Sequence, residues 1–165
     1  NQKKFFNFWD FNRELKYNRA ETTTGTPTTT KVVEGVDLTD YATDPGHEKK
    51  IKTIVTAIPE MSDPVEIDEY IKKVAPSSAV RGGMVKRAAD AYGVSVRLLL
   101  AIMQNDSHFG TKGKGARTRN PGNYGNDDTG QLIHFKTWEA GVRAVAAWLS
   151  DHKASETASL STPQG

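Results

Sequence analysis

The sequence predicts a mainly α-helical domain, an α+β fold with one small β-hairpin, preceded by an extended N-terminal arm. Apolar residues recur at helical spacing in five stretches between residues 47 and 152. A glycine- and asparagine-rich segment separates the last two stretches, and residues 1–45 lack the periodicity. We therefore expect an arm and linker over 1–45, a folded domain over 46–152 and a flexible tail over 153–165.

The arm has the composition of an attachment device. Its first residues are dense in aromatic side chains, namely Phe5, Phe6, Phe8, Trp9 and Phe11. The tract 22–30 is rich in threonine and has no apolar residue to bury, which indicates an extended linker. We expect residues 1–45 to bind a virion or envelope protein. The alternatives are that the aromatic cluster, which has basic residues beside it, lies on a membrane surface or docks on its own domain.

Three helices are expected before residue 95. The first carries an apolar stripe over 51–58 and ends at Pro59. The second begins within 62–66, where a capping residue precedes a proline and an acid, and it ends before Pro76. The third carries a stripe over 84–92 and ends at Gly93, a residue type common just after helices.

The helix after Ser95 contains an acid in an unusual place. Leu99, Ile102, Met103 and Asp106 fall at i, i+3, i+4 and i+7, so Asp106 is expected on the core side of the last turn. Burial and the helix dipole both disfavour a negative charge there. A carboxyl that keeps its proton near neutral pH can act as a general acid. The alternative is an aspartate that turns outward at a frayed helix end.

The segment 110–130 has no helical pattern and is predicted to be a functional loop. A short hairpin is expected to finish it, with Tyr124 on one strand, 126–130 in the turn and 131–135 on the other strand. The last helix is expected to begin after a capping Thr137.

Three pieces of sequence carry a resemblance to a known family. They are LLAIMQ at 99–104 with Ser107 and Phe109-Gly110, then GARTRNPGNYGN at 115–126, then WEAG at 138–141. Together they make residues 83–149 resemble the lysozyme-like superfamily, in particular the glucosaminidase and lytic transglycosylase domains that cleave peptidoglycan. The resemblance does not extend before Ser77, so 77–152 is the expected core of the domain.

The resemblance implies a site and a substrate. Asp106 matches the position of the family's catalytic glutamate and is the candidate catalytic residue. The candidate substrate-binding residues are Gln104, Ser107, Phe109, Asn123, Tyr124 and Asn126. Amides suit sugar hydroxyl and N-acetyl groups, and an aromatic face suits the rings. For Asn120 we favour simple turn chemistry, because asparagine tolerates left-handed backbone.

The aspartate itself departs from the family. Its side chain is one methylene shorter than glutamate, which sets the carboxyl back by roughly 1.5 Å, and a misplacement of about 1 Å can cost ~100-fold in rate. Three outcomes stay open: a slow enzyme, an enzyme with an adjusted helix end, or a binder without chemistry. A large gain in rate for Asp106→Glu would indicate a family site that is poorly placed.

A second catalytic carboxylate is not expected. Asp127, Asp128 and Glu139 are more simply turn or helix-start residues. Lytic transglycosylases of the kind this sequence resembles work with one acid, whereas many glycosidases use two. The reaction is therefore expected to be hydrolysis or intramolecular transfer at a β-1,4 glycosidic bond of peptidoglycan. The alternative is a non-catalytic lysozyme-like module, either a wall binder or a structural part of a virion or envelope assembly.

The composition limits which ligands and binding partners we expect for this protein. Cysteine is absent, and His108 and His134 have no partners at metal-ligand spacing, so we expect neither a metal nor a cofactor. A net charge of +2 is too small to indicate nucleic acid, and no apolar run is long enough to span a membrane. A basic cluster lies in the loop (Lys112, Lys114, Arg117 and Arg119). It suits an acidic wall polymer or is a solvated loop. We expect a protein of the virion or of the bacterial envelope or exterior.

Overall fold

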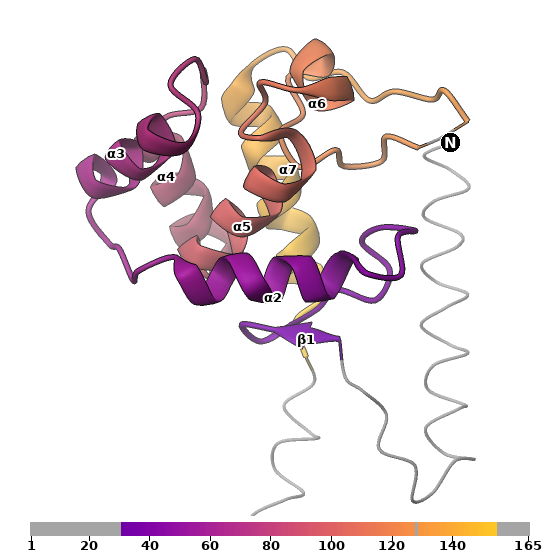
Figure 1. The fold of residues 1–165 in the computed structure, drawn as a ribbon, viewed down its shortest axis with the longest axis horizontal. Helices are drawn as coiled ribbons and strands as arrows, with labels where there is room; N and C mark the ends of the chain where they lie inside the picture. The colour runs from indigo at the N-terminus through magenta and orange to yellow at the C-terminus, as the bar shows by residue number, and fades with distance from the viewer. Residues whose placement is uncertain (1–30, 128, 155–165) are drawn as a thin grey trace, which may run out of the picture.

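The computed structural model describes residues 31–127 and 129–154, and the fold is mainly helical with a small antiparallel sheet (Figure 1). This confirms the predicted mainly helical class. The elements in order are β1 (Val32–Val33), β2 (Val36–Asp37), α2 (His47–Ala57), α3 (Pro64–Val74), α4 (Gly82–Tyr92), α5 (Val96–Ser107), α6 (Gly113–Thr118) and α7 (Trp138–Asp151). The aromatic cluster, the threonine-rich tract and the tail from residue 155 lie outside the described residues.

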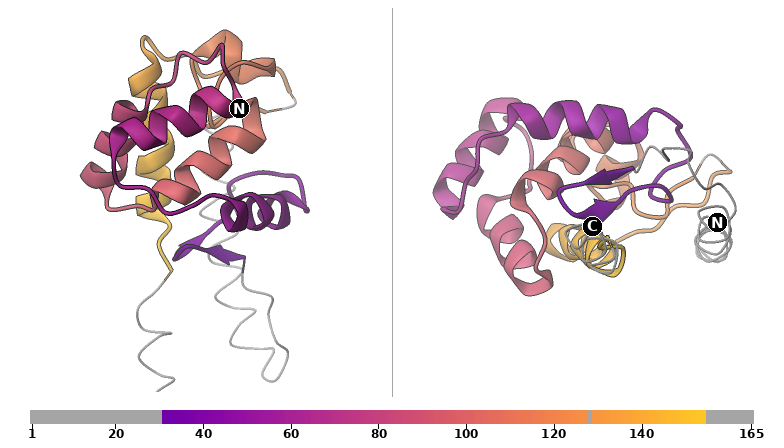
Figure 2. Two further views of the ribbon diagram at one scale, coloured as in Figure 1. Left: turned by 60° about the vertical axis from the view of Figure 1, so that its left-hand side comes forward. Right: turned by 90° about the horizontal axis from the view of Figure 1, so that it is seen from below.

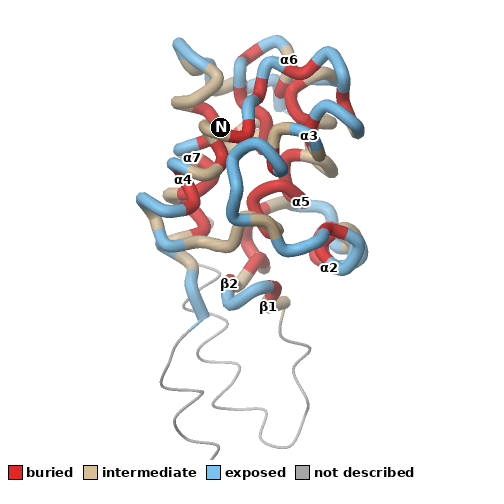
Figure 3. The backbone as a smooth tube through the Cα atoms, turned by 90° about the vertical axis from the view of Figure 1, so that its left-hand side faces the viewer, coloured by how far each residue is buried: buried red, intermediate tan, exposed pale blue. Residues whose placement is uncertain are grey.

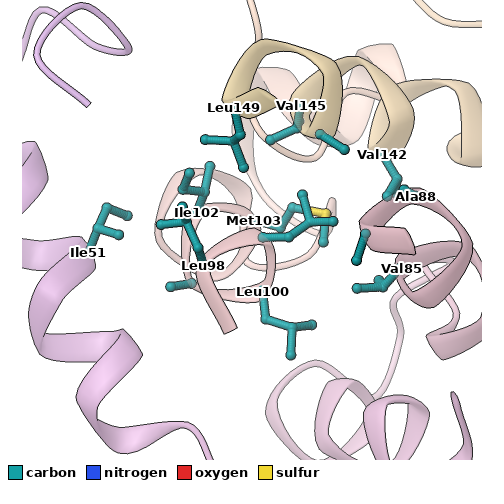
Figure 4. Packing of buried hydrophobic residues seen from close by; sticks show 14 of the residues in the cluster. Ile51, Val85, Ala88, Leu98, Leu100, Ile102, Met103, Val142, Val145 and Leu149 are labelled. Carbon is teal, nitrogen blue, oxygen red and sulfur yellow. The ribbon is translucent and has the colours of Figure 1, made fainter. Parts of the chain in front are cut away.

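Helix α5 lies at the centre of the domain. In Figure 4 its side chains point to different sides, toward Ile51 of α2, Val85 of α4 and Leu149 of α7. Every residue from Leu98 to Met103 is fully buried, so the predicted stripe is one face of a helix that is covered almost all round. Figure 3 shows the same arrangement, with the buried stretch of α5 inside and exposed turns outside. The acid is therefore carried by a helix that is buried over most of its length.

The helix ends follow the sequence signals. Asp63, Ser95 and Thr137 each accept a backbone N–H two or three residues further on, which caps α3, α5 and α7. Pro64 occupies the first position of α3. Gly93 ends α4 in the left-handed conformation, with φ of 63°. None of the helices among the described residues is both long and apolar enough to cross a membrane.

The predicted position of the β-hairpin is wrong. Residues 131–135 form no strand, because Ile133 N–H donates to the side chain of Asn126 and Phe135 N–H donates to the carbonyl of Thr118. The sheet forms instead at residues 32–37, around a turn in which Glu34 and Gly35 both have positive φ. The segment 110–130 is also not all loop, since it contains the short helix α6.

Residues 31–45 belong to the folded domain, which corrects the predicted boundary at residue 46. Their apolar side chains Val33, Val36, Leu38 and Tyr41 are buried in the common core. Strand β2 and the glycine before it also bond to the residues just after α7. Asp37 N–H donates to His152 O at 2.9 Å, and Ala154 N–H donates to Gly35 O at 2.8 Å. Figure 2 shows the strands beside the C-terminal end of α7. The two ends of the described domain are thus tied together.

Candidate functional site

The side chain of Asp106 lies where the helical spacing predicts, in the last turn of α5, and is 9% exposed. One carboxylate oxygen, Oδ1, receives two hydrogen bonds. His47 Nε2 lies 2.9 Å from it, and Asn105 Nδ2 donates to it at 2.8 Å. Among the described residues no donor reaches the other oxygen, Oδ2, and Oδ2 is not sealed from solvent. The carboxyl is therefore hydrogen-bonded through Oδ1, while Oδ2 keeps some contact with solvent.

His47 is the main site residue that the sequence reasoning missed. It is the first residue of α2, is only 5% exposed, and stands 59 positions before Asp106. A signal was present, because His47 precedes Ile51 by four and Val55 by eight, which extends the apolar stripe of α2 back to the histidine. The ring nitrogen Nδ1 is buried and has no hydrogen-bond partner among the described residues. The imidazole thus makes one polar contact, to the candidate acid.

Tyr41 supports this pair from the strand side of the domain. Its ring stacks on that of His47, with centroids 5.5 Å apart and planes 16° apart, and it meets Trp148 edge-on. Its hydroxyl donates to Gly122 O at 2.6 Å. Burial raises the pKa of the Tyr41 phenol well above 10.0, and the negative charge of Asp106 raises it further. Tyr41 is therefore a neutral donor that joins the segment before α2 to the loop after α6.

The asparagine-rich loop closes the site from the other side. Asn123 Nδ2 donates at 2.6 Å to the backbone carbonyl of Asp106, one of the carbonyls that a helix end leaves without a partner. Asn120 is fully buried and bonds both the N–H and the carbonyl of Tyr124, so its role is the turn chemistry that we expected. Gly115 lets α6 approach closely, since a Cβ there would lie 2.6 Å from the Cβ of Ser107.

Two predicted substrate-binding residues are buried and packed at the end of α5. Ser107 is buried, donates to Pro121 O at 2.5 Å and accepts from Gly110 N at 2.8 Å. Phe109 is fully buried and meets Tyr70 edge-on at 6.3 Å. Both side chains help to fix the end of α5.

The other predicted contacts lie nearer the surface. Gln104 is partly exposed, and its Oε1 accepts from Tyr70 at 2.5 Å. Tyr124 is half-buried. Asn126 accepts from Ile133 N at 2.8 Å, and its Nδ2 lies 3.3 Å from the side-chain oxygen of Asn123. The structure thus brings Asn123 directly onto the helix end that carries Asp106 and connects Asn126 to it through that bond.

The basic residues of the loop do not converge on the acid as a group. Lys112 and Arg117 are exposed, Lys114 donates to Asp127 O, and Arg119 donates to Lys136 O at 2.9 Å. Arg119 also lines an open hollow of about 690 Å³ at the start of α7, together with Met84, Lys136, Thr137, Trp138, Glu139, Ala140 and Arg143. This hollow does not include Asp106.

The neighbouring acids have the simple roles that we expected. Asp127 accepts from Thr129 N at 3.0 Å within a turn, and Glu139 pairs with Arg87 at 2.8 Å. Hydrogen bonding from Arg87 holds the pKa of Glu139 below its usual range. Asp128 lies outside the described residues. Within the described part of the chain, no group of three or more His, Cys, Asp or Glu side chains is arranged to hold a metal ion.

No family model, curated protein or solved structure matches this chain.

Proposed function

We propose that this domain is lysozyme-like and binds and cleaves the β-1,4-linked glycan strands of peptidoglycan, with Asp106 as the general acid. The observation that carries the proposal is the asymmetric carboxyl: Oδ1 receives two N–H donors and Oδ2 receives none from the described residues. A carboxylic acid in this setting carries its transferable proton on the open oxygen. A general acid needs an oxygen that can reach the substrate, and Oδ2 is the oxygen that the neighbouring donors leave available for this.

The proposed reaction balances with one carboxyl. Asp106 Oδ2–H gives its proton to the glycosidic oxygen as the bond from that oxygen to the anomeric carbon breaks. A hydroxyl then forms the new bond to the anomeric carbon, and its proton returns to Asp106. The hydroxyl belongs to water in hydrolysis and to the sugar itself in intramolecular transfer. A second carboxylate is needed in neither route if the attacking hydroxyl is held close.

Release of soluble muropeptides from isolated cell walls tests the proposal. Hydrolysis gives products with reducing ends, and intramolecular transfer gives products with an internal anhydro ring. The matched control is Asp106→Asn, which keeps the size of the side chain and an acceptor for His47 but has no acidic proton. Release by the wild type and loss by at least about 100-fold in this variant are expected. No release by the wild type at mildly acidic or neutral pH would reject the enzyme.

A second candidate is a non-catalytic module that binds the wall or forms part of a virion or envelope assembly. One observation favours it: Ser107 and Phe109 are buried in the packing of the domain, and Asn126 makes its hydrogen bonds within the loop. Sedimentation with intact peptidoglycan separates the candidates. Binding without release of fragments favours the module, and release favours the enzyme.

We also propose that residues 1–30 attach the domain to a virion or an envelope complex. The supporting observation is compositional, an aromatic cluster followed by a threonine-rich tract. A tether of this kind raises the local concentration of the domain near its target. Comparison of the full chain with a chain lacking residues 1–30 in binding to particle or envelope fractions tests it.

A further inference from the structure

We infer that His47 is a positioning residue for Asp106, which fixes Oδ1 and leaves Oδ2 to carry the reacting proton. This inference rests on the proposed glycan cleavage. It starts from the contact between the first residue of α2 and the last turn of α5, at 2.9 Å. Nothing in the motifs that carry the family resemblance includes this histidine, since they begin at residue 99.

The histidine ring is held from two directions. Its face stacks on Tyr41, and its edge meets Asp106 through Nε2. Tyr41 is itself held by its hydrogen bond to Gly122 O. The ring therefore has little freedom to turn, and the Nε2 position is set by the backbone of two separate segments.

The partners of the ring also select its tautomer. Nδ1 is buried and no described residue bonds to it, so a proton on Nδ1 would be a buried donor without an acceptor in this part of the chain. The neutral ring therefore carries its proton on Nε2, where Asp106 Oδ1 accepts it. Asn105 adds a second donor to the same oxygen. Both donors act on Oδ1, and rotation of the carboxyl would break both bonds.

The same two donors also act on the charge that proton transfer creates. When the proton leaves Oδ2, negative charge spreads onto Oδ1, where two N–H groups already point at it. The donors thus stabilise the carboxylate that proton transfer creates, and they do so at the position of an aspartate. The site is built for Asp106 as it stands, and His47 acts through it without touching the substrate.

Two variants of His47 separate the hydrogen bond from packing. His47→Phe keeps a ring to stack on Tyr41 but has no donor, and His47→Gln keeps an N–H donor but loses the ring. His134→Gln is the control, because His134 is exposed and makes no hydrogen bond or ion pair with the described residues. We expect His47→Phe to lower kcat for muropeptide release about 10–100-fold with KM little changed, as for a misplaced reacting group. His47→Gln should recover part of the loss, and His134→Gln should match the wild type.

A nuclear magnetic resonance measurement tests the pairing without turnover. A long-range proton–nitrogen spectrum of the histidine rings should show His47 protonated on Nε2, and Asp106→Ala should change that signal while leaving His134 unchanged. Wild-type kcat in His47→Phe, or a His47 proton on Nδ1, would overturn the inference and leave the proposed function standing. No release by wild-type protein would overturn both. Thermal melts of each variant show whether a loss of kcat reflects unfolding.

Discussion

Replacement of Gly141 by alanine tests how closely α7 must approach the loop that closes the site. A Cβ at this position would lie 2.1 Å from the carbonyl oxygen of Arg119 and 2.9 Å from Cδ of Pro121. The first distance is about 1.3 Å short of the 3.4 Å at which ordinary contact begins. Both neighbours belong to the chain backbone or to a proline ring, so neither can turn away.

Two effects of opposite sign compete in Gly141→Ala. Alanine gains roughly 0.5–1 kcal/mol over glycine inside a helix. Overpacking against rigid neighbours costs about 1–3 kcal/mol or more. The contact distance decides in favour of the second effect, because α7 and the loop at 119–121 must separate by about an ångström. We expect a net loss of roughly 1–2 kcal/mol, which lowers Tm by about 4–8 °C.

Gly83→Ala is the matched control in another helix. The nearest atom to a Cβ there is the guanidinium of Arg87 at 3.0 Å, the far end of a flexible exposed side chain. This variant should be as stable as the wild type or slightly more so. Thermal unfolding followed by circular dichroism compares the three proteins. A Gly141→Ala protein as stable as Gly83→Ala would refute the reasoning from the contact distances.

Three further changes give distinct expectations. Asp106→Glu should lower muropeptide release at least about 10-fold, since the longer side chain pushes its carboxyl past the donors that are placed for aspartate; a gain in rate would contradict this. Tyr41→Phe should cost about 1–2 kcal/mol near pH 7. Burial raises the pKa of Tyr41 above 10.0 in the folded state, so the stability that its hydroxyl provides is present below pH 10 and is lost as the pH rises through the folded-state pKa. The Tm of the wild type should therefore fall more steeply with alkaline pH than the Tm of Tyr41→Phe. Deleting residues 1–30 should leave Tm nearly unchanged, while deleting 1–45 should lower it markedly, because the second deletion removes buried core; equal Tm values for the two deletions would be inconsistent with that packing.

The part of the site that lies on one helix could be predicted from sequence. The spacing of Leu99, Ile102 and Met103 places Asp106 on the inner side of α5, and the structure has it there. Capping residues and Gly93 likewise mark helix ends, because their signals act within a few residues. The position of Asp106 and the ends of the helices depend only on residues that are close in sequence, so both could be predicted.

Contacts between distant segments could not be predicted in the same way. The partner of Asp106 stands 59 positions earlier, and the periodicity of α2 indicates only that His47 faces inward, without saying what it meets. The strands of the sheet have two residues each, too few for an alternating pattern to be read. Ser107 shows a third limit. A polar residue beside an acid can bind a ligand or can hydrogen-bond the backbone near its own helix end, and the hydroxyl of Ser107 bonds the backbone of Pro121 and Gly110.

The bonds between β2 and the residues after α7 have a mechanical consequence. Gly35 and Ala154 lie at the same end of the pairing between residues 35–37 and 152–154. A force that pulls Lys31 and Ala154 apart would therefore break the hydrogen bonds of this pairing in sequence. The segment released next leads through Tyr41 to His47, so tension would reach the donor of the candidate acid before it reached α5. We predict a low-force step before the main rupture when the chain is pulled at Lys31 and Ala154. A single rupture at high force would show that the sheet and the helical core resist tension as one unit.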